Sequence, residues 1–122
     1  MNKLEMSTLS KTWIFDLDGT LVRHNGYLSE ESLLPGVTEF FKNNISETDF
    51  VIIMTARSEN QTKSALELFK NNEIKYDKII TDLPHGERII YNDKKPFGLK
   101  TCYAFNLKRD AGIRDIKIKF CK

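Results

Sequence analysis

The sequence predicts an α/β fold, with an open, mostly parallel β-sheet and helices on both of its faces. Short runs of β-branched and aromatic residues alternate along the chain with two segments whose apolar residues recur at helical spacing. One run, residues 49–57, holds five consecutive apolar residues, which is typical of a central parallel strand covered on both faces. At 122 residues the chain has little room for a second core, so we expect one domain over residues 1–122.

The first strand is expected at residues 12–18, "TWIFDLD", a short aromatic and β-branched run. Residues 116–120, "IKIKF", alternate between apolar and basic side chains, as an exposed edge strand does. Three further short runs of strand-like composition lie between the second helix and this edge strand, at 76–81, 88–93 and 102–107.

Two helices are expected, at residues 37–45 and 59–72, because apolar side chains recur there every three or four positions. Ser58 directly precedes the second helix and is a candidate N-cap. Residues 21–35 contain a glycine and many polar residues, which favours a loop or short flap. Residues 1–11 are expected to form a loose leader.

The overall composition argues against nucleic-acid and membrane partners. The formal charge is only +2, which is too small for a nucleic-acid or anionic membrane surface. No apolar run approaches the length of a membrane span, and the polar N-terminus lacks a signal-peptide core, so we expect a cytoplasmic protein. Cys102 and Cys121 lack metal-like spacing and are expected to be reduced thiols.

Polar side chains follow three of the expected strands at their carboxyl ends. These residues are Asp16 and Asp18 on the first strand, Thr55 on the second, and Asn92 and Asp93 on the fourth. Ligands bind beyond the carboxyl ends of the strands in open α/β sheets. We therefore expect these five residues to converge on one site.

The carboxylates predict a divalent cation. Residues two apart on an extended segment point to the same side, so Asp16 and Asp18 face one pocket, and Asp93 would join them from a neighbouring strand. Three crowded carboxylates are costly unless a hard cation lies among them, and Mg²⁺ commonly binds carboxylates together with a substrate phosphate. The Thr20 hydroxyl is placed to fix one carboxylate.

This arrangement suggests phosphoryl transfer. An ionised Asp16 can attack phosphorus in line to give an aspartyl-phosphate, and Asp18 can act as the general acid and base. The Thr55 hydroxyl and the backbone N–H groups that follow it, at Ala56 and Arg57, lie at a helix N-terminus and suit phosphoryl oxygens. The Arg57 side chain either contacts phosphate or is an ordinary arginine at a helix start.

These motifs resemble those of the haloacid dehalogenase superfamily of phosphatases. The resemblance implies a three-layer, Rossmann-like fold without a cap domain, Mg²⁺ dependence, Asp16 as the nucleophile and Asp18 as the acid/base. It also implies that the Asp18 backbone carbonyl and the Asp93 side chain bind the metal, whereas Asn92 stands where many members carry a second acid. The matching stretches are "DLDGTL" at 16–21, "VIIMT" at 51–55 and "YNDKKP" at 91–96.

The chain departs from this family at the lysine that balances charge on the nucleophile and the phosphate. In short relatives this lysine precedes the fourth strand, but here Leu83 occupies the matching place in "DLPHGE". A cation must therefore come from elsewhere. Lys95 is preferred because it would lie on the same side as Asp93 in an extended chain, and the alternatives are Lys94 and Arg88.

The substrate expectation also rests on resemblance. Residues 76–112 resemble small phosphatases found with capsular-polysaccharide biosynthesis enzymes, which implies a phosphorylated sugar or another small capsule precursor. The motif spacing leaves no room for a cap, so the flap at 21–35 alone covers the site. Such an open site admits a bulky substrate or a second copy that completes it. The alternatives are a nucleotide or nucleic-acid-end phosphatase, and a non-catalytic binding domain of the same fold.

Overall fold

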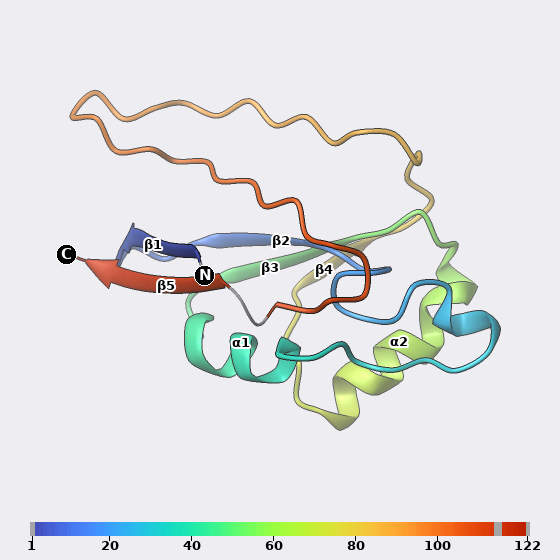
Figure 1. The fold of residues 1–122 in the computed structure, drawn as a ribbon. Coiled ribbons are helices and arrows are strands. Elements are labelled where there is room, and N and C mark those ends of the chain that lie inside the picture. Colours follow the sequence, from blue (N-terminus) through green and yellow to red (C-terminus); the bar gives the residue numbers. More distant parts are fainter. Residues whose placement is uncertain (1, 114–115, 122) are drawn as a thin grey trace.

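The computed structural model describes residues 2–113 and 116–121, and it has a small α/β fold with two parallel sheets and two helices (Figure 1). The larger sheet has the strand order β2-β3-β4, and the smaller one pairs β1 with β5. The prediction of a mostly parallel α/β fold is confirmed at this level. The elements in chain order are β1 (Asn2–Ser7), β2 (Thr12–Asp16), the 3₁₀ turn η1 (Gly26–Leu28), α1 (Val37–Asn44), β3 (Phe50–Met54), α2 (Glu59–Asn71), β4 (Lys78–Ile80) and β5 (Ile116–Cys121).

Both predicted helices are confirmed, to within a residue at their C-terminal ends. α2 begins with a complete capping box: the Ser58 hydroxyl accepts the Gln61 N–H, and the Gln61 side chain accepts the Ser58 N–H. α1 begins after Gly36, whose φ of 80° is in the left-handed region that glycine adopts without strain. A capping box thus marks the start of α2, and a glycine in a left-handed turn marks the start of α1.

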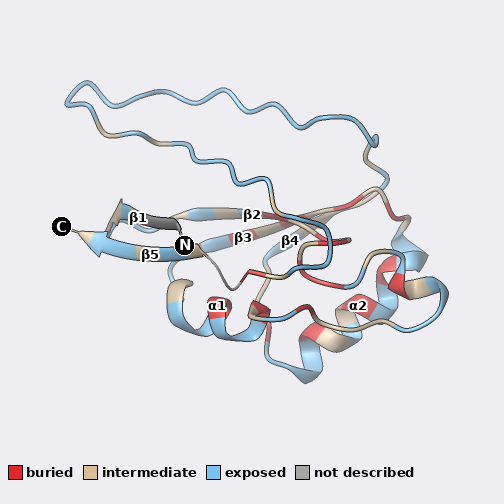
Figure 2. Ribbon diagram, viewed as in Figure 1, coloured by how far each residue is buried: buried red, intermediate tan, exposed pale blue. Residues whose placement is uncertain are grey.

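The core lies between the larger sheet and the two helices. Figures 1 and 2 show α1 and α2 on the same side of this sheet, with the buried positions gathered between them. Phe15 on β2 stacks on Phe41 of α1 with ring centroids 4.8 Å apart, and it meets Phe40 edge to face. Val51 and Ile53 on β3 are fully buried on the same face. Among the described residues no helix covers the opposite face, so the second helical layer stays a prediction.

The expectation of a loose leader is wrong for residues 2–7. They form β1, which pairs in parallel with β5 from Asn2↔Ile116 to Ser7↔Cys121. The partner strand lies more than a hundred residues away, so no local signal announces the pairing. The strand expected at 116–120 is confirmed as β5. Met1 lies outside the described residues.

The strands expected at 88–93 and 102–107 are also absent from the described fold. Residues 84–107, which we call the arm, leave the body after β4, run as an extended excursion and return before β5 (Figure 1). The backbone–backbone hydrogen bonds within this described segment are two at its tip, from Lys95 N–H to Leu99 and from Gly98 N–H to Lys95. Strand composition without a neighbouring strand to pair with gives no sheet.

The flap expected at 21–35 is present as a loop that contains η1 and packs beside α2.

Neither helix in the described parts of the chain combines the length and the apolar character needed to cross a membrane.

Candidate functional site

Asp16 ends β2 and carries an ion pair with a residue of the arm. Its Oδ1 accepts a hydrogen bond from Arg88 Nη1 at 2.8 Å, and its Oδ2 lies 3.5 Å from the Thr20 hydroxyl. The Asp16 side chain is 40% exposed and that of Arg88 33% exposed. The contact with Thr20 agrees with the sequence prediction. Asp16 is therefore held closely by Arg88 at Oδ1 and only by a long contact with Thr20 at Oδ2, and it is partly open to solvent at the carboxyl end of the sheet.

Asp18 is engaged on both oxygens by Arg57. Arg57 Nη2 donates to Oδ1 at 2.7 Å and Nε donates to Oδ2 at 2.9 Å, so the pair is bidentate. The backbone N–H of Asn25 in the flap also donates to Oδ1, at 3.1 Å. The Asp18 side chain is thus paired with a guanidinium on both oxygens and is not free.

Arg57 is a buried hub that connects the flap at 21–35, the DLDGTL segment at 16–21 and α2. Its side chain is 2% exposed, and it donates to Glu31 from both terminal nitrogens, at 2.6 and 2.9 Å. A further bond goes to the Gln61 carbonyl at 3.0 Å, and the Tyr27 ring lies 4.6 Å from the guanidinium carbon. With the bonds to Asp18, all five guanidinium N–H groups are used.

Charge and burial act in opposite directions on Arg57. Burial alone lowers the pKa of its guanidinium, but the hydrogen bonds that it donates to Glu31 and Asp18, and their negative charges, outweigh burial and raise this pKa. Arg57 therefore stays charged and positions Asp18, and in this structure it has no N–H left for a phosphate.

Thr55 and Ala56 lie where the sequence places them, just past the carboxyl end of β3. Asp16 is in register with Met54, so Thr55 follows on the strand next to Asp16. The Thr55 side chain is buried, and its hydroxyl accepts the Arg57 N–H at 3.0 Å. The Ala56 N–H has no hydrogen-bond partner within residues 2–113 and 116–121 and is free for an anion.

The remaining predicted site residues are on the arm and are not brought to the aspartate pair. Asp93 and Asn92 bond across the arm to Thr101, and Lys95 lies in the exposed turn at the tip. The expected convergence of Asp93 therefore fails, because residues 88–93 do not join the sheet. The structure does not bring Lys95, the preferred cation, to Asp16 either: the cation that pairs with Asp16 is Arg88, one of its alternatives.

A magnesium site needs more carboxylates than this arrangement offers. No group of three or more His, Cys, Asp or Glu side chains in the described ranges is close enough to hold a metal ion. Arg57 holds both oxygens of the Asp18 side chain, which leaves Asp16 as the one carboxylate of the predicted trio that is open to a ligand at the site. The resemblance makes the Asp18 backbone carbonyl the ligand, which this ion pair does not occupy, so the member of the predicted set that a single chain does not bring to the site is Asp93.

Sequence reasoning missed Glu31 and Tyr27, which complete the surroundings of Arg57. Glu31 is nearly buried and also accepts the Ser64 hydroxyl, which ties the flap to α2. Neither residue belongs to a periodic pattern or a motif. The available signal was Arg57 itself, since a buried arginine needs more than one acid or carbonyl partner.

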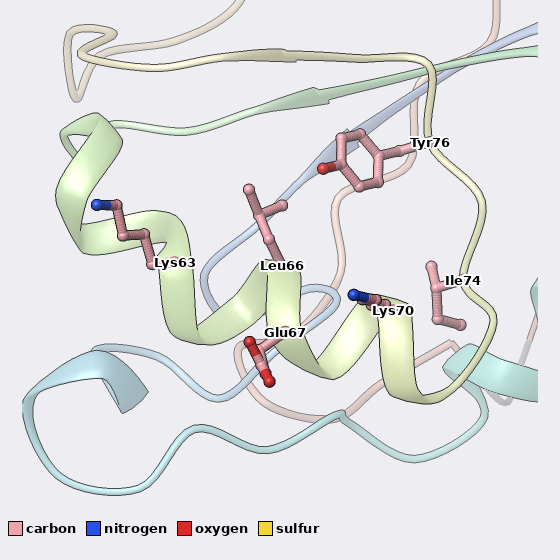
Figure 3. Close-up of a pocket in the computed structure, with 6 residues that line it drawn as sticks. All are labelled: Lys63, Leu66, Glu67, Lys70, Ile74 and Tyr76. Carbon is pink, nitrogen blue, oxygen red and sulfur yellow. The ribbon is translucent and has the colours of Figure 1, made fainter.

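A separate hollow lies along α2, away from these residues (Figure 3). The side chains that line it are Lys63, Leu66, Glu67, Lys70, Ile74 and Tyr76. None belongs to the predicted site, and the single acid is flanked by lysines. The hollow therefore lacks a nucleophile placed beside other polar groups, as an active site would need.

Comparisons of the chain with protein-family models, with curated proteins and with solved structures find no match.

Proposed function

We propose that this protein is a phosphomonoester hydrolase in which Asp16 is the nucleophile. The observation that carries the proposal is the geometry of Asp16: half-exposed at the carboxyl end of β2, fixed at Oδ1 by Arg88, and one strand away from Thr55. The N-terminal turn of α2 begins just beyond Thr55, so the region favours an anion. A fixed carboxylate beside an anion site suits covalent phosphoryl transfer.

The proposed reaction has two displacements at phosphorus. Oδ2 of Asp16, which Arg88 leaves open, attacks phosphorus, the bond from phosphorus to the ester oxygen breaks, and that oxygen leaves with a proton. Water then attacks the aspartyl-phosphate and loses a proton, and the phosphorus–Asp16 bond breaks to release inorganic phosphate. Arg88 uses one N–H on Asp16, so the rest of its guanidinium can offset charge on the phosphoryl oxygens.

Asp18 is the proposed proton carrier, and this role requires its ion pair to open. A carboxylate that accepts a guanidinium fork on both oxygens has no place for an acidic proton. Arg57 keeps its bonds to Glu31 and Gln61 if Asp18 turns away, so the hub need not unfold. We infer that substrate binding draws the Asp18 side chain away from Arg57, while Glu31 of the flap stays bonded to it.

The proposed fold and substrate follow the family resemblance. They are a three-layer, Rossmann-like architecture without a cap, and a phosphorylated sugar or other small capsular-polysaccharide precursor. The residues that support this substrate class are 76–112, whose sequence resembles small capsule-biosynthesis phosphatases. The half-exposed nucleophile is consistent with a site that no cap covers.

Mg²⁺ dependence belongs to the same proposal. When bound, the ion would offset the charges of the phosphate and of Asp16. Within residues 2–113 and 116–121 of one chain, no group of three acids is close enough to hold this ion.

The deciding experiment measures phosphate release from sugar, polyol and nucleotide monophosphates, each with and without Mg²⁺. Turnover should require Asp16, so Asp16→Asn should lose at least about 10³-fold in kcat while keeping its thermal unfolding midpoint. The control Glu47→Gln makes the same chemical change on the exposed surface and should keep wild-type turnover. Turnover by Asp16→Asn at the wild-type rate would refute the nucleophile. Faster turnover of nucleotides than of sugar phosphates would favour the nucleotide alternative.

One observation favours a second candidate, a non-catalytic binding domain. Asp18, the proposed acid/base, is held in an ion pair by Arg57, as expected of a site that binds a ligand without transferring a proton. This candidate predicts binding of phosphate compounds to wild-type protein without release of phosphate from any substrate in the panel. Product formation by the wild type, absent from Asp16→Asn, would exclude it.

A further inference from the structure

The arm, residues 84–107, carries large apolar side chains that the described chain leaves exposed or only partly covered. Tyr91 is 93% exposed, the highest value among them. Figure 2 shows nearly the whole arm as exposed. Soluble chains rarely leave such a contiguous apolar surface unless it contacts a partner. The members are Ile89, Ile90, Tyr91, Phe97, Tyr103 and Phe105.

A complementary surface lies on the larger sheet. α1 and α2 cover one face, and the alternation of side chains places Ile14 and Phe50 on the other, where they are 46% and 45% exposed. Ile52, Met54 and Ile80 are on the same face and only partly buried. Asp16, two residues after Ile14, shares this face. β2 is also an edge strand, since β3 is its one neighbour in the described sheet.

The direction of the arm determines whether it can run parallel to β2 of its own chain or to β2 of a second copy of the chain. Arg88 lies beside Asp16 at the carboxyl end of β2, and in Figure 1 the outgoing half of the arm runs from this end of the sheet back antiparallel to β2. The run of residues that follows Arg88 is thus carried away from the carboxyl end of β2 in its own chain. A twofold axis perpendicular to the strands reverses this relation. The same run then lies parallel to β2 of a second copy and carries Asp93 toward the carboxyl end of that strand.

We propose that two copies of this chain form a twofold dimer by exchanging arms, each arm covering the open face and the β2 edge of the other copy. Every copy has both surfaces, so the exchange is self-complementary and closes at two. Added to β2, residues 88–93 also gain backbone partners that they lack in a single chain.

The buried area is sufficient for a stable dimer. Aromatic side chains bury roughly 150–250 Å² each when fully covered, and the exposed fractions of the four rings on the arm leave roughly 400–600 Å² of this to be buried. With the two isoleucines and the sheet face that the partner's arm covers, the area lost per copy is on the order of 800 Å², which is the size that a standard interface requires of each partner.

The exchange would also supply the carboxylate that the predicted metal site lacks in a single chain, an inference that rests on the proposed function. Asp93 of one copy would stand beside Asp16 of the other, while Arg88 at the base of the same arm holds Asp16 of its own chain. Five extended residues separate Arg88 from Asp93, which is about 17 Å. The two sites in the dimer therefore lie about this far apart, each built from both copies.

The first test measures molar mass by light scattering coupled to gel filtration, and it needs no activity. Wild-type protein should have twice the mass of one chain. Tyr91→Lys with Ile89→Lys should shift it to the monomer mass at the same loading, because charge on the arm opposes burial. The control Lys100→Ala changes an exposed arm residue outside the apolar set and should stay dimeric. A wild-type monomer, with the arm folded on its own sheet, would overturn the proposal, and so would a dimer that the double variant leaves intact.

The second test asks whether Asp93 acts in the other copy. Asp16→Asn and Asp93→Asn should each be inactive alone, but mixing them after unfolding and refolding together should restore up to a quarter of wild-type turnover. Half of the molecules are then mixed dimers, and one of their two sites has both aspartates. Absence of recovery in confirmed mixed dimers would overturn the placement of Asp93. If wild-type protein shows no turnover at all, the proposed function fails and the mass measurement still decides the dimer.

Discussion

Arg88 Nη1 lies 2.8 Å from Asp16 Oδ1, although 72 residues separate the two in the chain. Together with the Arg57–Asp18 pair, this contact gives each aspartate of the DLDGTL segment at 16–21 its own arginine. The negative charges that the sequence places side by side are thus balanced within the protein. The two arginines differ in one respect that matters: Arg57 is saturated and buried, whereas Arg88 is exposed and keeps free donors.

Removing the Arg88 guanidinium should impair catalysis more than folding. We expect Arg88→Ala to lower kcat for phosphate release by about 10²-fold, because one preorganised charge at the phosphoryl group is lost. Arg88→Lys should recover part of the rate, since the charge returns without the fork. Lys100→Ala is the matched arm control. A loss of this size with Lys95→Ala and not with Arg88→Ala would identify Lys95 as the cation.

Removing Arg57 should instead destabilise the fold. Arg57→Met leaves Asp18 and the nearly buried Glu31 without their cation, and we expect the free energy of unfolding in urea to fall by about 3–5 kcal/mol. Adding Glu31→Gln should return part of this loss, because an uncompensated charge is removed. The exposed Arg23→Met is the control. A loss below about 1 kcal/mol would show that the hub contributes little to stability.

Asp49 should make stability depend on acid pH. Burial raises the pKa of Asp49, but hydrogen bonds from Ser46, Trp13 and Lys11 outweigh it and lower this pKa from the ordinary 3.8. Its contribution is therefore present above the ordinary value and is lost as pH falls through the lower folded-state value.

Asp49→Asn provides the measurement. At neutral pH the variant should be less stable by about 1–3 kcal/mol, because an amide cannot accept all three bonds. Urea unfolding at successively lower pH should show this difference shrinking below about pH 4. A difference that stays constant into strong acid would contradict the assignment.

Two glycines form a matched pair for a backbone prediction. A Cβ on Gly112 would overlap the backbone carbonyl of Pro35, and the φ of Gly112 is +83°. Gly112→Ala should therefore lower the free energy of unfolding by about 3 kcal/mol or more, whereas Gly86→Ala meets nothing within 4 Å and should be near neutral. Equal thermal unfolding midpoints for the two variants would contradict the packing at Gly112.

The elements predicted correctly are those whose signal is local and whose burial is complete. The apolar run at 49–57 yields β3, and Ser58 with Gln61 caps α2, because a capping box needs only four neighbouring residues. The errors concern pairing. Residues 88–93 have the composition of a strand, but a strand forms only when another lies alongside, and composition does not name the neighbour.

The site residues likewise divide into those whose positions the sequence predicted and those whose partners it did not. The positions of Asp16 and Thr55 followed from the ends of two adjacent parallel strands, so their proximity was predictable. The partners of the aspartates were not, because Arg57 reaches 39 residues back to Asp18 and Arg88 reaches 72 back to Asp16. Long side chains have many rotamers, and only the folded body selects among them.

By itself the sequence determined the alternation of strands and helices and the placement of Asp16 and Asp18 at the end of a strand, because periodicity, capping and burial act over short stretches of chain. Only the tertiary structure decided that residues 2–7 pair with 116–121, that arginines balance the aspartates and that the arm leaves the sheet. These outcomes depend on contacts between distant residues. Their free energies are set by which surfaces meet in space.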